Sequence, residues 1–146
     1  MKTARLMLLS ALLLTTAASA SAATRGWGVG AGVFDGDFAA QVRKDFWLGG
    51  DISQITGQAG IFFPGETSFR LDTDYHFMIQ TSEGSTSRFY PLGGVSFAFN
   101  SDHAKFGLNL GGGVNFMLTE TTAGFAELKY ILSDWDGFAI TAGIYF

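Results

Sequence analysis

The sequence predicts an all-β fold, a closed antiparallel up-and-down barrel of eight strands. Apolar residues recur at every second position through most of the chain, without the three- and four-residue spacing of helices. Turn-forming residues divide the chain into segments of roughly ten residues. The 146 residues include 20 Gly and only 2 Pro, so most of these segments contain no strand-breaking proline. Repeated strands of this length, joined by short turns, are typical of a closed barrel.

The first residues are predicted to be a signal peptide that is not part of the fold. A basic start at Lys2 and Arg5 is followed by a short apolar run at 6–14 and by small residues at 18–23. The run is too short to span a membrane as a helix, which disfavours an uncleaved anchor. We expect a signal peptide at 1–23 and one barrel domain at 24–146. The expected cleavage positions follow Ala20, Ala22 or Ala23.

The strands follow from alternation along the rest of the chain. In 68–80, apolar side chains fall on one face and charged or polar side chains on the other. Residues 105–118 repeat this pattern, with Gly and Asn on the polar face. Turn signals such as Asp35-Gly36 separate the segments. The predicted strands are 26–34, 37–46, 52–63, 67–80, 88–99, 105–118, 123–133 and 137–146.

The side chains on the two faces predict what each face contacts. The apolar face carries bulky residues such as Phe69, Tyr75 and Phe77, whereas the interior of an eight-stranded barrel is barely wide enough for side chains. Glycine is frequent on the other face. We therefore expect the apolar face to point outward and the glycine-rich face inward, as in a transmembrane β-barrel. The alternative is a soluble periplasmic barrel that encloses a lipid-like ligand.

Composition excludes several classes of protein. The absence of cysteine excludes disulfides and lipid attachment at an N-terminal cysteine. Without Lys2 and Arg5, the exported chain has 7 basic and 13 acidic residues. This negative charge argues against a nucleic-acid partner.

The predicted inward face carries charges of both signs. An isolated buried charge costs several kcal/mol or more, so these groups must form pairs. We expect a salt-bridged interior that fills the lumen; the alternative is a narrow ion or proton path lined by Asp72, Asp74 and His76. The predicted lumen network consists of Arg43, Asp45, Arg70, Asp72, Asp74, His76, Lys105, Glu127 and Lys129.

No catalytic, cofactor or metal site is predicted. Asp72, Asp74 and His76 point the same way from one strand, but a further nitrogen or thiolate ligand for a metal is missing. The only other histidine, His103, is expected in a turn. The consecutive residues 101–103, Ser-Asp-His, have diverging side chains that do not form a catalytic relay.

The C-terminal end carries the most specific pattern. Apolar side chains occupy alternate positions up to a terminal aromatic: Phe138, Ile140, Ala142, Ile144 and Phe146. Together with the signal peptide, this pattern resembles the small eight-stranded outer-membrane β-barrel proteins of Gram-negative bacteria, the outer membrane protein beta-barrel domain family, over 24–146. The resemblance implies that the last strand is an assembly signal read by the barrel assembly machinery. We expect a monomer in the outer membrane, with the surrounding lipids as partners.

The resemblance implies a location more clearly than an activity. Some members of this class are lipid A acyltransferases or deacylases with Ser or His beside a carboxylate on the membrane-facing rim, whereas His76 is expected to face inward. Adhesins and receptors of the class generally have long external loops, whereas the turns here are short. We expect a non-enzymatic protein with a structural or interaction role in the cell envelope and a mostly plugged lumen. The alternatives are a narrow ion or small-solute channel and a lipid A-modifying enzyme.

Overall fold

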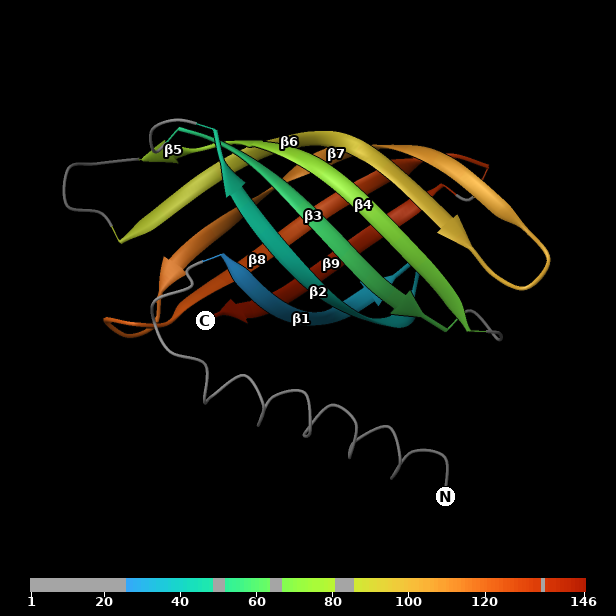
Figure 1. The fold of residues 1–146 in the computed structure, drawn as a ribbon, viewed down its shortest axis with the longest axis horizontal. Coiled ribbons are helices and arrows are strands. Elements are labelled where there is room, and N and C mark those ends of the chain that lie inside the picture. The colour runs from blue at the N-terminus through green and yellow to red at the C-terminus, as the bar shows by residue number, and fades with distance from the viewer. Residues whose placement is uncertain (1–25, 49–51, 64–66, 81–85, 135) are drawn as a thin grey trace, which may run out of the picture.

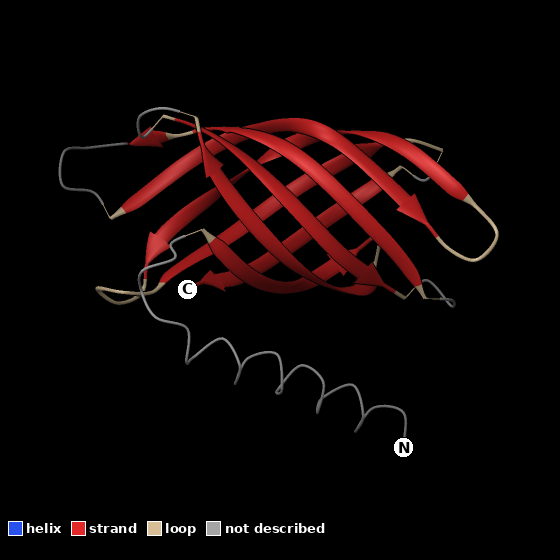
Figure 2. Cartoon of the chain, in the orientation of Figure 1, coloured by secondary structure: helices blue, strands red, loops and turns tan. Residues whose placement is uncertain are grey.

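The computed structural model describes residues 26–48, 52–63, 67–80, 86–134 and 136–146, and every regular element in them is a β-strand (Figure 2). The predicted signal peptide at 1–23 lies outside the described residues. No helix in the described ranges has the length and apolar character needed to cross a membrane. The strands are β1 (Trp27–Phe34), β2 (Asp37–Trp47), β3 (Ser53–Phe62), β4 (Ser68–Phe77), β5 (Ile79–Gln80), β6 (Ser87–Phe99), β7 (Ala104–Met117), β8 (Ala123–Leu132) and β9 (Gly137–Tyr145).

The strands form one closed antiparallel sheet. Apart from β4 and β5, strands that are neighbours in the sequence pair with each other; β4 pairs with β6, and β1 pairs with β9 to close the barrel (Figure 1). The two-residue β5 continues the line of β4 along β6. If β4 and β5 are counted as one interrupted strand, the barrel has eight strands. The predicted fold class is therefore confirmed, and the predicted strand boundaries differ from the observed ones by a few residues.

One predicted strand is interrupted. Residues 67–80 were expected to form a single strand, but the structure divides them at Met78 into β4 and β5. The break lies opposite Pro91 of β6, since the β4–β6 register ends at the pair His76 and Leu92 and resumes at Ile79 and Phe89. Proline has no backbone N–H to donate to the ladder. On the side of β3 the ladder continues past the break, because the Met78 N–H donates to the Ile52 carbonyl at 2.7 Å.

The turn between β1 and β2 contains only two residues. Asp35 and Gly36 both have positive φ, 48° and 91°, as a type I′ turn requires. The twist of this turn matches that of the flanking strands. Phe34 and Asp37 are consequently paired, and the register of the whole β1–β2 hairpin follows.

The two faces of the wall are assigned as predicted. In β4, buried and exposed residues alternate without exception, from buried Ser68 to exposed Phe77. On β7, Leu108 is 51% exposed whereas Asn109 is 1% exposed. The outer surface therefore carries the large apolar side chains and the lumen carries the polar ones.

Inward glycines make room for two inward aromatic rings. Phe125 of β8 is fully buried, and a Cβ added at Gly30 or Gly143 would lie 2.8 or 2.7 Å from its ring. A Cβ at Gly113 would lie 2.5 Å from the ring of Tyr90. Even an alanine would thus be too large at these positions, which explains why the inward face is rich in glycine.

Apolar side chains close the lumen at the end opposite the C-terminus. Phe34, Phe62, Ile131 and Ala139 form one buried cluster there, and the rings of Phe34 and Phe62 meet edge to face at 5.2 Å between centroids. Nearer the C-terminal end, a second cluster contains Met78, Tyr90 and Leu92. The polar part of the lumen lies between these two layers and continues toward the C-terminal end.

Candidate functional site

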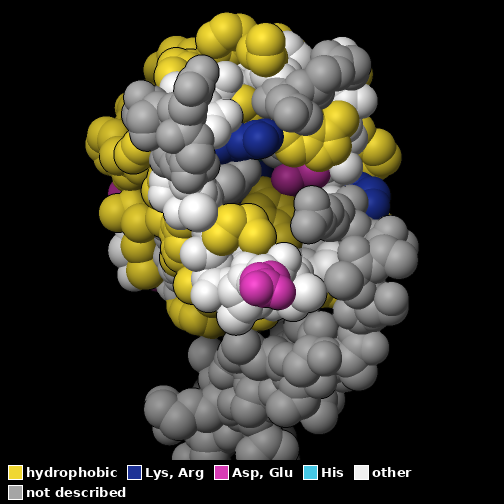
Figure 3. All heavy atoms as spheres, turned by 90° about the vertical axis from the view of Figure 1, so that its left-hand side faces the viewer, with side chains coloured by type: hydrophobic (Ala, Val, Ile, Leu, Met, Phe, Trp, Pro, Cys, Tyr) yellow, Lys and Arg dark blue, Asp and Glu magenta, His cyan; other side chains and the backbone are white. Residues whose placement is uncertain are grey.

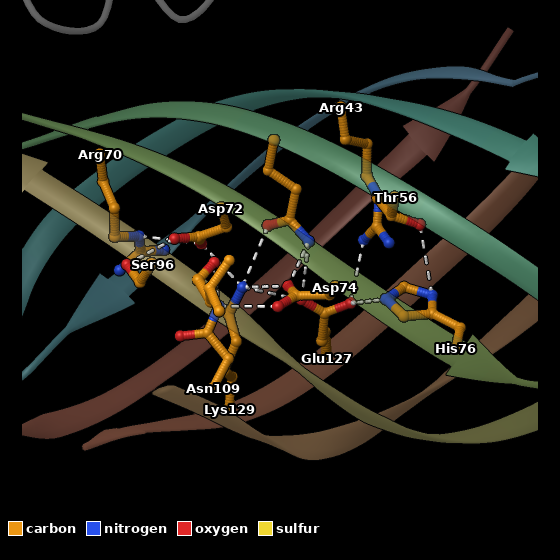
Figure 4. A network of polar contacts seen from close by, with 12 residues as sticks. Arg43, Thr56, Arg70, Asp72, Asp74, His76, Ser96, Asn109, Glu127 and Lys129 are labelled. Atoms are coloured by element: carbon orange, nitrogen blue, oxygen red, sulfur yellow. Dashed lines mark hydrogen bonds and ion pairs between the residues drawn. The ribbon is translucent and has the colours of Figure 1, made fainter. Parts of the chain in front are cut away.

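Three strands supply the charged groups of the lumen. Strand β4 carries a polar residue at every second position, β2 faces it across β3, and β8 approaches from the opposite wall. Each contributing side chain is buried. The group comprises Arg43 and Asp45 of β2, Arg70, Asp72, Asp74 and His76 of β4, and Glu127 and Lys129 of β8. Figure 4 labels these residues apart from Asp45.

Lys129 is the centre of the network. Its Nζ lies 2.8 Å from Asp72 Oδ2 and 2.7 Å from Asp74 Oδ2, and it donates to Gln58 Oε1 at 3.3 Å. The Glu127 carboxylate is 3.8 Å away. One ammonium group thus binds two adjacent carboxylates of β4 and offsets their mutual repulsion in the barrel interior.

Arg43 forms the second centre, nearer the C-terminal end. Its Nη1 donates to Glu127 Oε2 at 3.1 Å, and its Nε lies 3.7 Å from Asp45 Oδ1. The guanidinium carbon lies 4.3 Å from the centroid of the Phe125 ring and 5.5 Å from that of Tyr145. Ion pairing and cation–π contacts together hold this buried charge.

Arg70 extends the network toward the opposite end. Its Nε lies 3.1 Å from Asp72 Oδ2, and its guanidinium carbon lies 5.2 Å from the centroid of the Phe34 ring. Arg70 therefore links the ion pairs to the apolar cluster that closes this end.

His76 is held on three sides. Its ring stacks on Tyr90 at 4.3 Å between centroids and 10° between planes, and Gln54 Nε2 lies 3.2 Å from its Nδ1. An amide nitrogen can only donate, so Nδ1 accepts and a neutral His76 carries its proton on Nε2. That nitrogen lies 3.9 Å from Glu127 Oε2.

Neutral polar side chains complete the network. Asn109 Nδ2 donates to Asp74 Oδ1 at 2.7 Å, Ser96 Oγ to Asp72 Oδ1 at 2.6 Å, and the Tyr90 hydroxyl to Glu127 Oε2 at 3.0 Å. Thr56 Oγ1 donates to Asp45 Oδ1 at 2.8 Å. The prediction from charge alone did not include these residues. The signal that could have identified them is their position, because they alternate on the inward face as the charged residues do.

Lys105, the remaining predicted member, lies near one end of the lumen. It is half-buried in β7 and lines a small void with Arg70 and Phe34 at the end opposite the C-terminus. That void and a second one beside Arg70 each measure about 10 Å³, which is room for about one water molecule. Around Arg70 the lumen is thus packed with side chains.

The described residues contain no group of three or more His, Cys, Asp or Glu residues placed to hold a metal ion. In the turn at 101–103, the Asn100 side-chain oxygen accepts hydrogen bonds from the backbone N–H groups of Asp102 and His103 at 3.1 and 2.8 Å. These exposed residues therefore shape a turn between β6 and β7.

Solved structures of outer-membrane barrels share this fold. The N-terminal β-barrel domain of Pseudomonas aeruginosa OprF matches with a TM-score of 0.64 and 16% identity, over 84% of this chain and 98% of that one. The outer membrane enzyme PagL matches with a TM-score of 0.54 and 10% identity, over 82% of this chain and 96% of that one. The Yersinia pestis outer membrane protein Ail matches with a TM-score of 0.50 and 15% identity, over 83% of this chain and 99% of that one.

These similarities identify the fold and leave the activity open. No protein-family model matches the sequence, and no curated protein gives a significant match. At such low identity, one barrel architecture is shared by proteins with different roles, one of them an enzyme. The function must therefore be argued from the lumen and the surface of this chain.

Proposed function

We propose that this chain is a non-enzymatic outer-membrane β-barrel protein of a Gram-negative envelope, with a structural or interaction role and a lumen closed to solutes. The observation that carries the proposal is the network around Lys129. It crosses the lumen from β8 to β4 with contacts of 2.7 and 2.8 Å to Asp74 and Asp72. A solute would have to separate these buried ion pairs, and breaking a buried pair is strongly unfavourable.

The membrane location is supported by the outer surface. Aromatic and aliphatic side chains such as Phe106, Leu110 and Phe138 are more than half exposed around the wall, as expected where lipid is the solvent. Two of the similar solved structures are described as outer membrane proteins. In this proposal the C-terminal strand, ending at Phe146, is the segment that the assembly machinery reads.

The absence of catalysis is part of the proposal. His76 is completely buried against Tyr90 and is out of reach of a lipid substrate at the rim. Asp102 and His103 lie in an exposed turn, where their backbone N–H groups are used to form the turn. Thr56 Oγ1 lies 3.4 Å from His76 Nδ1, and Glu127 Oε2 lies 3.9 Å from His76 Nε2. All three side chains are buried in the lumen, where a lipid substrate at the rim does not reach them.

Assembly is the first experiment. Outer membranes containing the full-length chain, or the same chain without Phe146, would be run on a detergent gel with and without boiling. We expect a compact unboiled band that is lost or much reduced when Phe146 is removed. A soluble periplasmic protein with no heat-dependent shift would overturn the proposed location.

The closed lumen is tested by conductance of the purified barrel in planar lipid bilayers. We expect no stable conductance steps, and steady ion flow would make the chain a channel. Mass spectrometry of lipid A from cells with and without the protein should give identical spectra. A loss or gain of one acyl chain would overturn the non-enzymatic proposal.

A further inference from the structure

The two ends of the lumen differ in depth. The end near Phe34 and Phe62 is filled by the apolar cluster, whereas a cavity of about 290 Å³ opens at the end that carries the C-terminus, here named the C-terminal mouth. Figure 3 views this end, and basic and acidic side chains lie within it among hydrophobic ones. The cavity is close to the lower limit of about 300 Å³ for small-molecule sites. It can therefore hold a headgroup, though not a whole lipid.

The cavity does not continue as a pore. Asp45 and Tyr145 line it, and below Asp45 the guanidinium of Arg43 lies against the rings of Phe125 and Tyr145. Arg43 in turn binds Glu127 at 3.1 Å. The mouth is therefore a blind pocket whose floor is the ion-pair network.

Opposite charges line two separate walls of the pocket. Asp45 lies on β2 and Arg88 on β6. In the barrel wall these two strands are separated by β3 and by the interrupted strand β4–β5. A ligand with a single charge would meet one attractive and one repulsive group. A ligand that carries an anion and a cation a few bonds apart would present an opposite charge to each, in addition to the contacts that Asp45 makes with Arg43 and Thr56.

The type of cation follows from the acceptors around it. Asn115 lines the same cavity, and its Oδ1 is buried without a hydrogen-bond partner in the structure. A buried acceptor of this kind calls for a donor. A primary ammonium has three N–H donors for Asp45 and Asn115, whereas a quaternary ammonium has none.

Aromatic side chains form part of the lining of the pocket. Trp47, Phe116 and Phe146 line it, and aromatic side chains at a barrel rim lie at the membrane interface, where lipid headgroups are found. We propose that the C-terminal mouth binds a zwitterionic phosphoethanolamine group, with the ammonium at Asp45 and Asn115 and the phosphate at Arg88. This site rests on the proposed membrane location, but not on the closure of the lumen.

The test uses the full-length folded barrel in a neutral detergent. Short-chain phosphatidylethanolamine, phosphatidylcholine and phosphatidylglycerol would be titrated in turn, with calorimetry and tryptophan fluorescence as readouts, since Trp47 lines the cavity. We expect phosphatidylethanolamine to bind about tenfold tighter than the other two, from its additional charge-assisted hydrogen bonds. Equal affinity for all three lipids would overturn the site.

Variants separate the two charges. Asp45→Asn should remove the preference for phosphatidylethanolamine over phosphatidylcholine, and Arg88→Gln should weaken all three lipids. Lys44→Gln is the matched control, because Lys44 is the neighbour of Asp45 on the outer face and packs over the Trp27 ring. A preference that survives both Asp45→Asn and Arg88→Gln would overturn the site. If Asp45→Asn does not fold, as shown by the loss of the compact unboiled band, the affinities measured with Arg88→Gln alone test the site.

Free O-phosphoethanolamine distinguishes the two sources of this chemistry. Competition by the free compound would identify a soluble zwitterion as a sufficient ligand, and its failure to compete would identify the lipid. The conductance measurement remains separate. A barrel that conducts ions while it still prefers phosphatidylethanolamine would refute the closed lumen and leave the headgroup site standing.

Discussion

Two neighbouring residues of β7 lie in different environments. Leu108 is half exposed on the outer surface, whereas Asn109, the next residue, is buried in the lumen and donates to Asp74 Oδ1 at 2.7 Å. In the proposed membrane location, lipid would set the cost of a substitution on the outer face, mainly through polarity. On the inner face, the cost depends on which partner is lost. The same chemical change should therefore have different consequences one residue apart.

Lys129→Met should have the largest effect of the changes considered. It leaves Asp72 and Asp74 buried without the ammonium that binds both, and we expect the free energy of unfolding to fall by about 3 to 5 kcal/mol. Urea unfolding in detergent micelles, followed by tryptophan fluorescence, would measure this. Lys105→Met is the control, because Lys105 is half-buried near the end of the lumen.

A compensating variant sharpens this test. Adding Asp72→Asn and Asp74→Asn to Lys129→Met removes the two carboxylates that the first change left without Lys129. Part of the lost stability should return, because polar groups without net charge cost less to bury than isolated ions. A further loss of stability in the triple variant would show that pairing with Lys129 is not the source of the effect.

Leu108→Arg should come next. A charged side chain on the lipid face near mid-membrane destabilises a barrel by about 2 to 4 kcal/mol. The measurement is the same unfolding experiment in lipid bilayers, with Leu108→Met as the apolar control of similar size. A harmless Leu108→Arg would mean that the two faces have been assigned the wrong way round.

Ser96→Ala tests the neutral part of the lumen. Ser96 Oγ donates to Asp72 Oδ1 at 2.6 Å, and a hydrogen bond to a charged group contributes about 1.5 to 3 kcal/mol. We expect a loss within this range in the same assay. Ser96→Thr keeps the hydroxyl group, so a loss equal to that of Ser96→Ala would point to packing instead.

The smallest effect is expected at Leu110. It is 56% exposed to the outer surface, so Leu110→Met exchanges one apolar side chain for another in lipid. The free energy of unfolding should change by no more than about 0.5 kcal/mol. A change above 1.5 kcal/mol would indicate that this part of the wall is packed against something other than lipid.

Alternation along the sequence was enough to predict the fold and its two faces, because side-chain direction in a strand depends only on the position within that strand. The break at Met78 could not be predicted in this way, because its cause is Pro91 on a different strand. The pairing of Lys129 with Asp72 and Asp74 depends on how far the strands are staggered around the barrel. Composition does not specify that stagger.

The seam between β1 and β9 ties folding to the end of the chain. It joins Gly28 to Tyr145 and Phe34 to Ala139. The sheet therefore closes only when residues from the first and last strands of the barrel pair with each other. Contacts between such distant residues form slowly, because the intervening loop must first be closed. Until the last strand arrives, β1 and β8 each present an unpaired edge on which another chain could add a strand. A nascent molecule of this protein is therefore most vulnerable to aggregation just before it is complete, and a chaperone that shields these two edges would protect it most.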